Sequence, residues 1–156
     1  MYRHILIPTD GSELSQQAVE HGVALARSIN ANVTALTVLS PFRTFAAEPA
    51  MIADTREQHE RRMARLAATC LNAAKDAATA AGVSCDTVHV EHDHPYQAII
   101  DTAARKSCDL IVMASHGRHG MSAIVLGSET VKVLTHSAIP VLVFRAPGAA
   151  AFLVAS

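Results

Sequence analysis

The chain has 156 residues, half of them hydrophobic, and its 13 Lys and Arg almost balance its 14 Asp and Glu, for a formal net charge of -1. This length suits one domain with a sizeable apolar core, and the composition excludes a disordered or low-complexity chain. A chain this close to neutral lacks the basic field that drives nonspecific nucleic-acid binding.

Nothing in the hydropathy pattern predicts a membrane protein. A transmembrane helix needs about 20 apolar residues in a row, and no such run occurs. The apolar stretch after Met1 ends at Pro8, which is too short for the core of a signal peptide. We therefore expect a cytoplasmic protein with neither a membrane nor a nucleic acid as its partner.

The first part of the chain predicts two strands with a helix between them. Residues 3–9 (RHILIPT) contain a continuous apolar run typical of a buried strand. Apolar residues then recur near helical spacing from Leu14 to about Asn30. Residues 32–39 (NVTALTVL) are rich in β-branched side chains, which favours a second strand. Residues 40–53 predict a loop or a short irregular insertion.

Helices and strands continue to alternate in the second part. Residues 54–81 predict a long helix with Gly82 as its C′ residue. Residues 83–90 predict a third strand, and Pro95 suits the first position of the next helix. Residues 109–114 (DLIVMA) predict a fourth strand buried on both faces. A glycine-containing loop over 115–126, a helix over 127–135 and a fifth strand over 140–144 (PVLVF) complete the pattern.

This alternation predicts an α/β fold with a single doubly wound, Rossmann-like parallel sheet of five strands and helices on both faces. The chain shows neither an internal repeat nor a linker. We therefore expect one domain over residues 1–146, followed by a C-terminal tail over residues 147–156.

The residues with the clearest chemistry follow the first and fourth strands. Ligands of such sheets bind beyond the carboxyl ends of the strands, where the strand order reverses. The first strand leads into Thr9-Asp10, the fourth into His116-Gly117, and Gly127-Ser128 opens the last helix. A Gly-Ser pair there offers free backbone N–H groups and the positive end of the helix dipole, which favour phosphate. The alternative is ordinary loop glycines with a serine near an N-cap.

The chain lacks the sequence motifs of several enzyme classes. The chain has no Gly-Lys-Ser or Gly-Lys-Thr of a P-loop, no Gly-x-Gly-x-x-Gly after the first strand and no Gly-x-Ser-x-Gly nucleophile elbow. Asp10 is the only carboxylate at the end of the first strand, whereas phosphoryl transfer relies on metal and charge clamps. We therefore predict no catalytic residue and at most slow phosphoryl transfer.

The nine histidines and three cysteines also raise the question of metals and disulfides. The densest group of possible ligands is residues 91–94 (EHDH), but Pro95 indicates that the strand has ended and no third ligand lies nearby. We expect a solvated loop with a helix N-cap at Asp93 or His94 and no metal site. The odd number of cysteines, with no Cys-x-x-Cys pair, predicts three small buried thiols.

Two long segments resemble the universal stress protein family, a group of small adenine-nucleotide-binding proteins. They are HILIPTDGSELSQQAVEHGVALA and DLIVMASHGRHGMSAIVLGSETVKVLTHSAIPVLVFR. The ATP-binding signature of that family is Gly, two residues, Gly, nine residues, then Gly-Ser or Gly-Thr. Gly117, Gly127 and Ser128 fit this signature, and Ala114 replaces its first glycine. The resemblance implies an adenine nucleotide alpha hydrolase-like fold with strand order 3-2-1-4-5.

The resemblance also implies a ligand, ATP or AMP with Mg²⁺, and a site for it. Asp10 would lie near the ribose or the metal, backbone groups of Val38 would meet the adenine edge, and Arg118 would meet phosphate unless it is a solvated loop residue. The full set of implied site residues is Pro8, Thr9, Asp10, Val38, Met113, Ala114, His116, Gly117, Arg118, Gly120, Gly127, Ser128, Glu129 and Thr130.

The favoured function is a stress-response module that binds ATP or AMP and signals through partners that the sequence does not identify. The resemblance implies a homodimer, and the apolar fifth strand, residues 140–144, would be a sheet edge that pairs with a second copy. A small nucleotide hydrolase or nucleotidyl transferase on a related fold is one alternative. A family member that binds no nucleotide, favoured only by Ala114, is the other.

Overall fold

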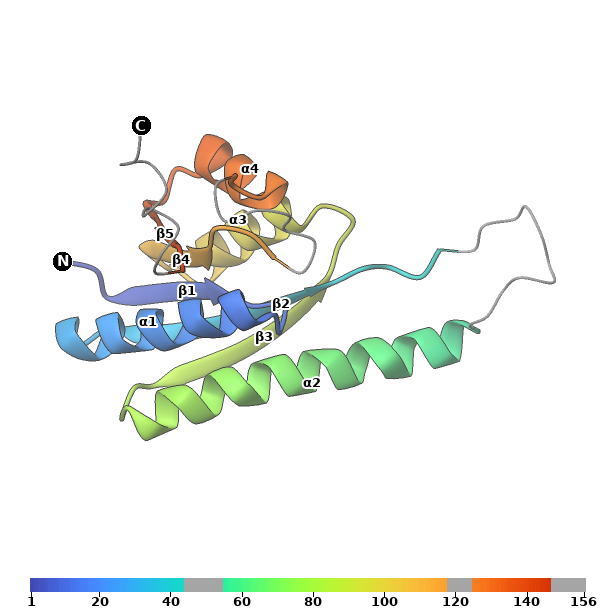
Figure 1. The fold of residues 1–156 in the computed structure, drawn as a ribbon, viewed down its shortest axis with the longest axis horizontal. Helices are drawn as coiled ribbons and strands as arrows, with labels where there is room; N and C mark the ends of the chain where they lie inside the picture. The colour runs from blue at the N-terminus through green and yellow to red at the C-terminus, as the bar shows by residue number, and fades with distance from the viewer. Residues whose placement is uncertain (44–54, 118–124, 147–156) are drawn as a thin grey trace, which may run out of the picture.

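The structure is a computed structural model that describes residues 1–43, 55–117 and 125–146. Its five-stranded sheet has the order β3-β2-β1-β4-β5, which confirms the expected topology (Figure 1). The elements in chain order are β1 (His4–Pro8), α1 (Glu13–Ile29), β2 (Asn32–Leu39), α2 (Arg56–Ala80), β3 (Cys85–Glu91), α3 (Pro95–Arg105), β4 (Leu110–Ala114), α4 (Ser128–His136) and β5 (Val141–Phe144).

The predicted elements are all present, and the ends of most of them move by a residue or two. The third strand begins at Cys85 rather than Val83, because the Val83 N–H donates to the Ala78 carbonyl at 2.9 Å and closes the end of α2. Gly82, with φ +70°, has the left-handed conformation expected of a C′ residue. Most of the predicted 40–53 and 115–126 loops and the whole 147–156 tail lie outside the described residues.

Helices cover both faces of the sheet, α1 and α2 on one and α3 and α4 on the other (Figure 1). Successive side chains of β1 point to opposite faces. Ile5 and Ile7 therefore pack against α1 and α2, while Leu6 packs with Ile99 and Val133 of α3 and α4. The central strands are buried on both sides, as the apolar run over β4 predicts.

The long helix α2 begins at a capping box. The Thr55 hydroxyl accepts the Gln58 N–H at 3.2 Å, and the Gln58 side chain accepts the Thr55 N–H at 2.9 Å. Its 25 residues make it the longest helix, but none of the helices within the described ranges is long and apolar enough to cross a membrane.

The burial of each cysteine depends on where its helix or strand lies in the fold. Cys70 and Cys108 are buried as predicted, but Cys85 is only half-buried, because it begins the edge strand β3. The prediction of three buried thiols is therefore wrong for Cys85. Burial raises the pKa of the Cys108 thiol to about 11, so this thiol stays protonated and unreactive at neutral pH.

Gly22 allows α1 to lie close against the sheet. A Cβ at this position would lie 2.5 Å from Cδ1 of Ile7, a fully buried side chain. Gly22→Ala should therefore lower the free energy of unfolding by about 1 kcal/mol, because overpacking costs about 1–3 kcal/mol and the better helix propensity of alanine offsets about 1 kcal/mol.

The Ile7→Val substitution removes Cδ1, the atom that the new methyl group would meet. In that background Gly22→Ala should be neutral or stabilising. Denaturant unfolding of the wild type, both single variants and the double variant measures this coupling. Additive effects of the two substitutions would contradict the close approach of Gly22 to Ile7.

Asp109 fastens the beginning of β1 to the beginning of β4. Its Oδ2 accepts the Arg3 N–H at 2.9 Å, and its Oδ1 accepts the His4 N–H at 3.0 Å. Desolvation alone would raise the pKa of this carboxyl, but the hydrogen bonds from His4 and Arg3 outweigh it and hold the pKa below its ordinary value. The charged carboxylate therefore stabilises the folded state.

This lowered pKa predicts a pH-dependent effect of Asp109→Asn. The stabilisation is complete above the unfolded-state pKa of about 3.9 and is lost as the pH falls through the lower, folded-state pKa. The substitution should lower the free energy of unfolding near neutral pH, by an amount that shrinks at about pH 3 and below. Denaturant unfolding measures both, with Asp101→Asn on the exposed side of α3 as the control. A loss that is equal at both pH values would rule out this role.

Candidate functional site

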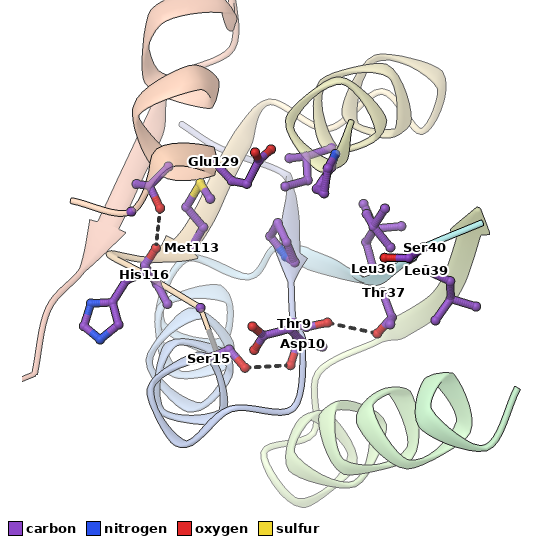
Figure 2. A pocket seen from close by; sticks show the side chains of 18 of the residues that line it. Thr9, Asp10, Ser15, Leu36, Thr37, Leu39, Ser40, Met113, His116 and Glu129 are labelled. Carbon is purple, nitrogen blue, oxygen red and sulfur yellow. Dashed lines mark hydrogen bonds between the residues drawn. The ribbon is translucent and has the colours of Figure 1, made fainter. Parts of the chain in front are cut away.

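A cavity of about 490 Å³ opens at the carboxyl ends of β1 and β4 (Figure 2). β1 pairs with β2 on one side and with β4 on the other, so the strand order reverses there, as the sequence predicts. All the predicted site residues within the described ranges line this cavity: Pro8, Thr9, Asp10, Val38, Met113, Ala114, His116, Gly117, Gly127, Ser128, Glu129 and Thr130. Arg118 and Gly120 lie outside the described residues. The role of each residue toward a ligand stays a prediction.

Asp10 is held on the cavity by the turn that follows β1. Its Oδ1 accepts the Ser12 N–H at 2.9 Å, across Gly11, which has φ +78°. Ser12 is in turn the N-cap of α1, and its hydroxyl accepts the Ser15 N–H at 3.3 Å. The Asp-Gly-Ser sequence therefore ends the strand, begins the helix and orients the carboxylate.

Gly117 brings the loop after β4 against this carboxylate. A Cβ at Gly117 would lie 2.5 Å from Oδ2 of Asp10. Any side chain at position 117 would therefore displace either the loop or the Asp10 carboxylate. Gly117 therefore permits a close approach between the loop after β4 and the turn after β1.

Gly127 has a similar steric role at the beginning of α4. Its φ of -62° is open to any residue. A Cβ there, however, would lie 3.1 Å from the His116 Cα and 3.4 Å from the Ser115 carbonyl oxygen. The Gly127 N–H also donates to that oxygen at 2.7 Å. The lack of a side chain thus allows the start of α4 to pack directly on the loop after β4.

The start of α4 presents backbone donors to the cavity. Gly127 is the N-cap without a side-chain capping bond, and its carbonyl accepts the Val131 N–H at 3.0 Å. The N–H groups of the residues between them precede the first intrahelical bond, and those residues line the cavity. Together with the helix dipole, these donors favour an anion.

Two contacts fix α4 beside its neighbours. The Thr130 hydroxyl donates to the Ala114 carbonyl at 3.0 Å and ties the helix to β4. The Glu129 carboxylate accepts the Tyr96 N–H of α3 at 2.8 Å and pairs with Lys132 at 3.1 Å. The carboxylate of Glu129 thus joins α3 to α4. The group that Glu129 can offer to an anion is its backbone N–H.

Ala114 fits the position that a glycine has in the signature. It is the last residue of β4, pairs with Phe144 of β5 and is 7% exposed. The positive-φ residues other than glycine in the described part of the chain are Asn30 and Ser107, so Ala114 adopts no conformation that would require glycine. The replacement therefore adds no backbone strain at the end of β4.

Buried hydroxyl groups form the floor between β1 and β2 (Figure 2). The Thr9 and Ser15 hydroxyls lie 3.1 Å apart, and the Thr37 hydroxyl donates to the Thr9 carbonyl at 3.0 Å. The Thr9 N–H donates to the Leu36 carbonyl at 2.8 Å, which ends the ladder between the strands. Beyond it β2 continues along the cavity to Leu39 without β1, paired with β3 on its other side.

That continuation leaves a free backbone edge on β2. The Leu36 carbonyl points toward β1, whereas the Leu39 carbonyl points toward β3 and accepts the His92 N–H at 3.0 Å. Because backbone groups alternate along a strand, the N–H and C=O of Val38 point to the β1 side, past the end of β1. Val38 lines the cavity, so this donor and acceptor are available to a ligand.

Helix α2 supplies a wall that the sequence analysis missed. His59, Met63 and Leu66 line the cavity, as do Pro95 and Ile99 of α3. The expected site was drawn from strand ends and the start of the last helix, so it contained no residue of α2. The spacing of these three α2 residues, which places them on one helix face, was the available signal.

The loop after β3 has a structural role. His94 is the N-cap of α3, one of the two predicted positions. Asp93 forms an ion pair with Arg43, which holds the pKa of the Asp93 carboxyl below its ordinary value. Within the described ranges, His, Cys, Asp and Glu side chains form no group of three or more that is arranged to hold a metal ion.

A doubly wound parallel sheet with a cavity at its switch point defines an α/β protein of the ligand-binding type. The family model described as "Universal stress protein family" matches residues 1–145. Universal stress protein MJ0531 of Methanocaldococcus jannaschii is 33% identical over 151 residues, which cover 94% of this chain and 84% of that protein. The chain belongs to the universal stress protein family.

Solved structures agree with this assignment. Hypothetical protein MJ0577 aligns with a TM-score of 0.79 and 26% identity, over 95% of this chain and 99% of that one. A universal stress protein crystallised in complex with cAMP aligns with a TM-score of 0.68 and 26% identity, over 92% of this chain and 97% of that one.

Proposed function

We propose that this protein binds an adenine nucleotide, ATP or AMP, in the cavity at the switch point and acts in the cytoplasm as a stress-response module. The start of α4 carries the proposal, because Gly127 packs on the loop after β4 and the backbone donors that follow line the cavity. The related universal stress protein in complex with cAMP supports an adenine nucleotide as the class of ligand.

The cavity has a suitable group for each part of such a ligand. The free N–H and C=O of Val38 match the acceptor and the amino donor on one edge of adenine, with Ile99 and Met113 among the apolar lining. The Asp10 carboxylate suits ribose hydroxyls or Mg²⁺, which keeps several waters and binds phosphate oxygens. The phosphates would meet the N–H groups at the start of α4.

Binding rather than turnover is the activity that this lining supports. Its described residues include no Lys or Arg, and its two carboxylates are Asp10 and Glu129, the second of which is paired with Lys132. Phosphoryl transfer relies on cationic clamps on the transferred group. We therefore infer that ATP is hydrolysed slowly at most.

Calorimetric titration with ATP and AMP tests the proposal directly. We expect dissociation constants in the micromolar range, which correspond to a binding free energy of about -8 kcal/mol. ATP should bind more tightly with Mg²⁺ than without it. A ligand that binds only the folded state also raises the melting temperature. If millimolar nucleotide gave neither heat nor thermal stabilisation, the cavity would serve another ligand or none.

We also propose a homodimer through the outer edge of β5. Pro140 and Phe144 direct their carbonyls to β4, accepting the N–H groups of Ile111 and Ser115 at 2.9 and 2.8 Å. By alternation, the N–H and C=O groups of Val141 and Val143 point away from the sheet.

The side chains near this edge support a second copy as its partner. Leu142 of β5 is 42% exposed, and Val131 and Leu134 of α4 are 44% and 42% exposed. The opposite edge, β3, carries Asp86 and Glu91, charges of the kind that discourage pairing between sheets. A two-fold axis would pair the β5 edges and close the assembly.

A further inference from the structure

Glu129, at the beginning of α4, caps the neighbouring helix rather than its own. Its carboxylate projects toward α3 (Figure 2), and Oε2 accepts the Tyr96 N–H at 2.8 Å. The N-cap of α3, His94, makes no side-chain capping bond, and Pro95 at the start of that helix has no N–H to offer. The Glu129 carboxylate therefore takes the place that an anion would have at the positive end of α3.

The starts of α3 and α4 border the same cavity but differ in what they offer to a ligand. Pro95 of α3 and Ser128, Glu129 and Thr130 of α4 line it. The Glu129 N–H precedes the first intrahelical bond of α4, so it belongs to the donors that favour an anion. The carboxylate of the same residue carries a negative charge. A phosphate bound at the start of α4 therefore lies close to that charge.

Lys132 compensates this charge only in part. Its Nζ lies 3.1 Å from Oε1 of Glu129, and the two side chains are 46% and 36% exposed, so water screens the pair. Glu129 lines the cavity and Lys132 does not, which places the negative end of the pair nearer to a ligand. Asp10 adds a second carboxylate to the described lining, which contains no Lys or Arg. A ligand thus meets a net negative charge in the part of the lining that the structure describes.

We propose that Glu129 is a specificity-determining residue, which favours a nucleoside monophosphate over a triphosphate through charge repulsion. The inference rests on the proposed nucleotide binding. The donors at the start of α4 can hold one phosphate, with which AMP carries a charge of about -2. The further phosphates of ATP add a charge of about -2, while the Tyr96 N–H is already taken by Glu129. Charges within about 10 Å of one another interact at ordinary ionic strength, so Glu129 opposes the added charge.

Glu129→Gln removes the charge but keeps a side-chain oxygen that can accept the Tyr96 N–H. Without Mg²⁺, which would offset the repulsion, we expect the ratio of ATP to AMP dissociation constants to fall about three- to tenfold, with both nucleotides bound more tightly. Lys132→Gln leaves the carboxylate uncompensated and should raise the same ratio about twofold or more. Adenosine is uncharged and should bind every variant within about twofold of wild type. Glu20→Gln, on the exposed side of α1, is the control.

Calorimetric titration of ATP, AMP and adenosine into the wild type and the three variants gives these ratios, and melting temperatures show that each variant is folded. A ratio that falls for Glu129→Gln and rises for Lys132→Gln, with both changes smaller at high salt, supports the inference. A ratio that does not fall for Glu129→Gln, or that moves the same way in both variants, overturns it while AMP binding by the wild type stands. If the wild type binds neither nucleotide, the proposed function fails and this inference fails with it.

Discussion

Valine at position 127 should weaken AMP binding by at least about tenfold while the protein stays folded. The substituted Cβ would lie 3.1 Å from the His116 Cα, so either the loop after β4 or the start of α4 must move. Such a shift misplaces the backbone donors of α4, and each hydrogen bond to a charged group contributes about 1.5–3 kcal/mol. Because the φ of Gly127 is -62°, valine adds no backbone strain.

Calorimetry with AMP measures this loss, and the effect should be graded. Gly127→Ala adds a single methyl group and should cost less than valine. Ala104→Val, on the exposed side of α3, adds the same side chain away from the cavity and should leave binding unchanged. Wild-type affinity in Gly127→Val would show that the close packing of Gly127 on His116 has no part in binding.

Val143→Pro should turn the proposed dimer into monomers at micromolar concentration. The Val143 N–H points away from β4, so proline removes a donor from the free edge and leaves the ladder between β4 and β5 in place. In a two-fold dimer both copies carry the substitution, so every hydrogen bond that it removes is lost twice. The dimer dissociation constant should therefore rise about ten- to a hundredfold. Light scattering over a concentration series measures it.

Two neighbouring substitutions make this result specific. Val143→Ala keeps the N–H and should remain dimeric. Leu142→Pro removes a donor that points toward β4, so it should lower the melting temperature rather than act on the dimer alone. A wild type that is monomeric at micromolar concentration, or a Val143→Pro variant that stays dimeric, would exclude pairing through β5.

The strands could be predicted because their pattern is strong and local, whereas their order was implied by the family resemblance. Buried parallel strands are continuous apolar runs, and β4 is the clearest example, with every residue buried. The N-cap at Ser12 and the helix end at Gly82 follow from the preferences of single residue types. Cys85 was assigned wrongly because burial at a sheet edge depends on which strand lies beside it.

The site was only partly predictable, because its second wall comes from a helix. Glycine spacing and strand ends indicate Asp10, Gly117 and Gly127. The inward position of His59 depends on how α2 crosses the sheet, which no local pattern encodes. In the same way, the steric role of Gly127 appears only when the His116 backbone is seen beside it.

The central position of β1 imposes an order on assembly during synthesis. β1 pairs with β2, which follows it closely in the chain, but its hydrogen bond from His4 to Asp109 spans 105 positions. The ribosome therefore makes the half-sheet of β1, β2 and β3 first, and β4 docks later against the unpaired edge of β1. The cavity exists only after that docking, so a nucleotide that fills it would hold the late half to the early half and slow the local opening of β4 and β5.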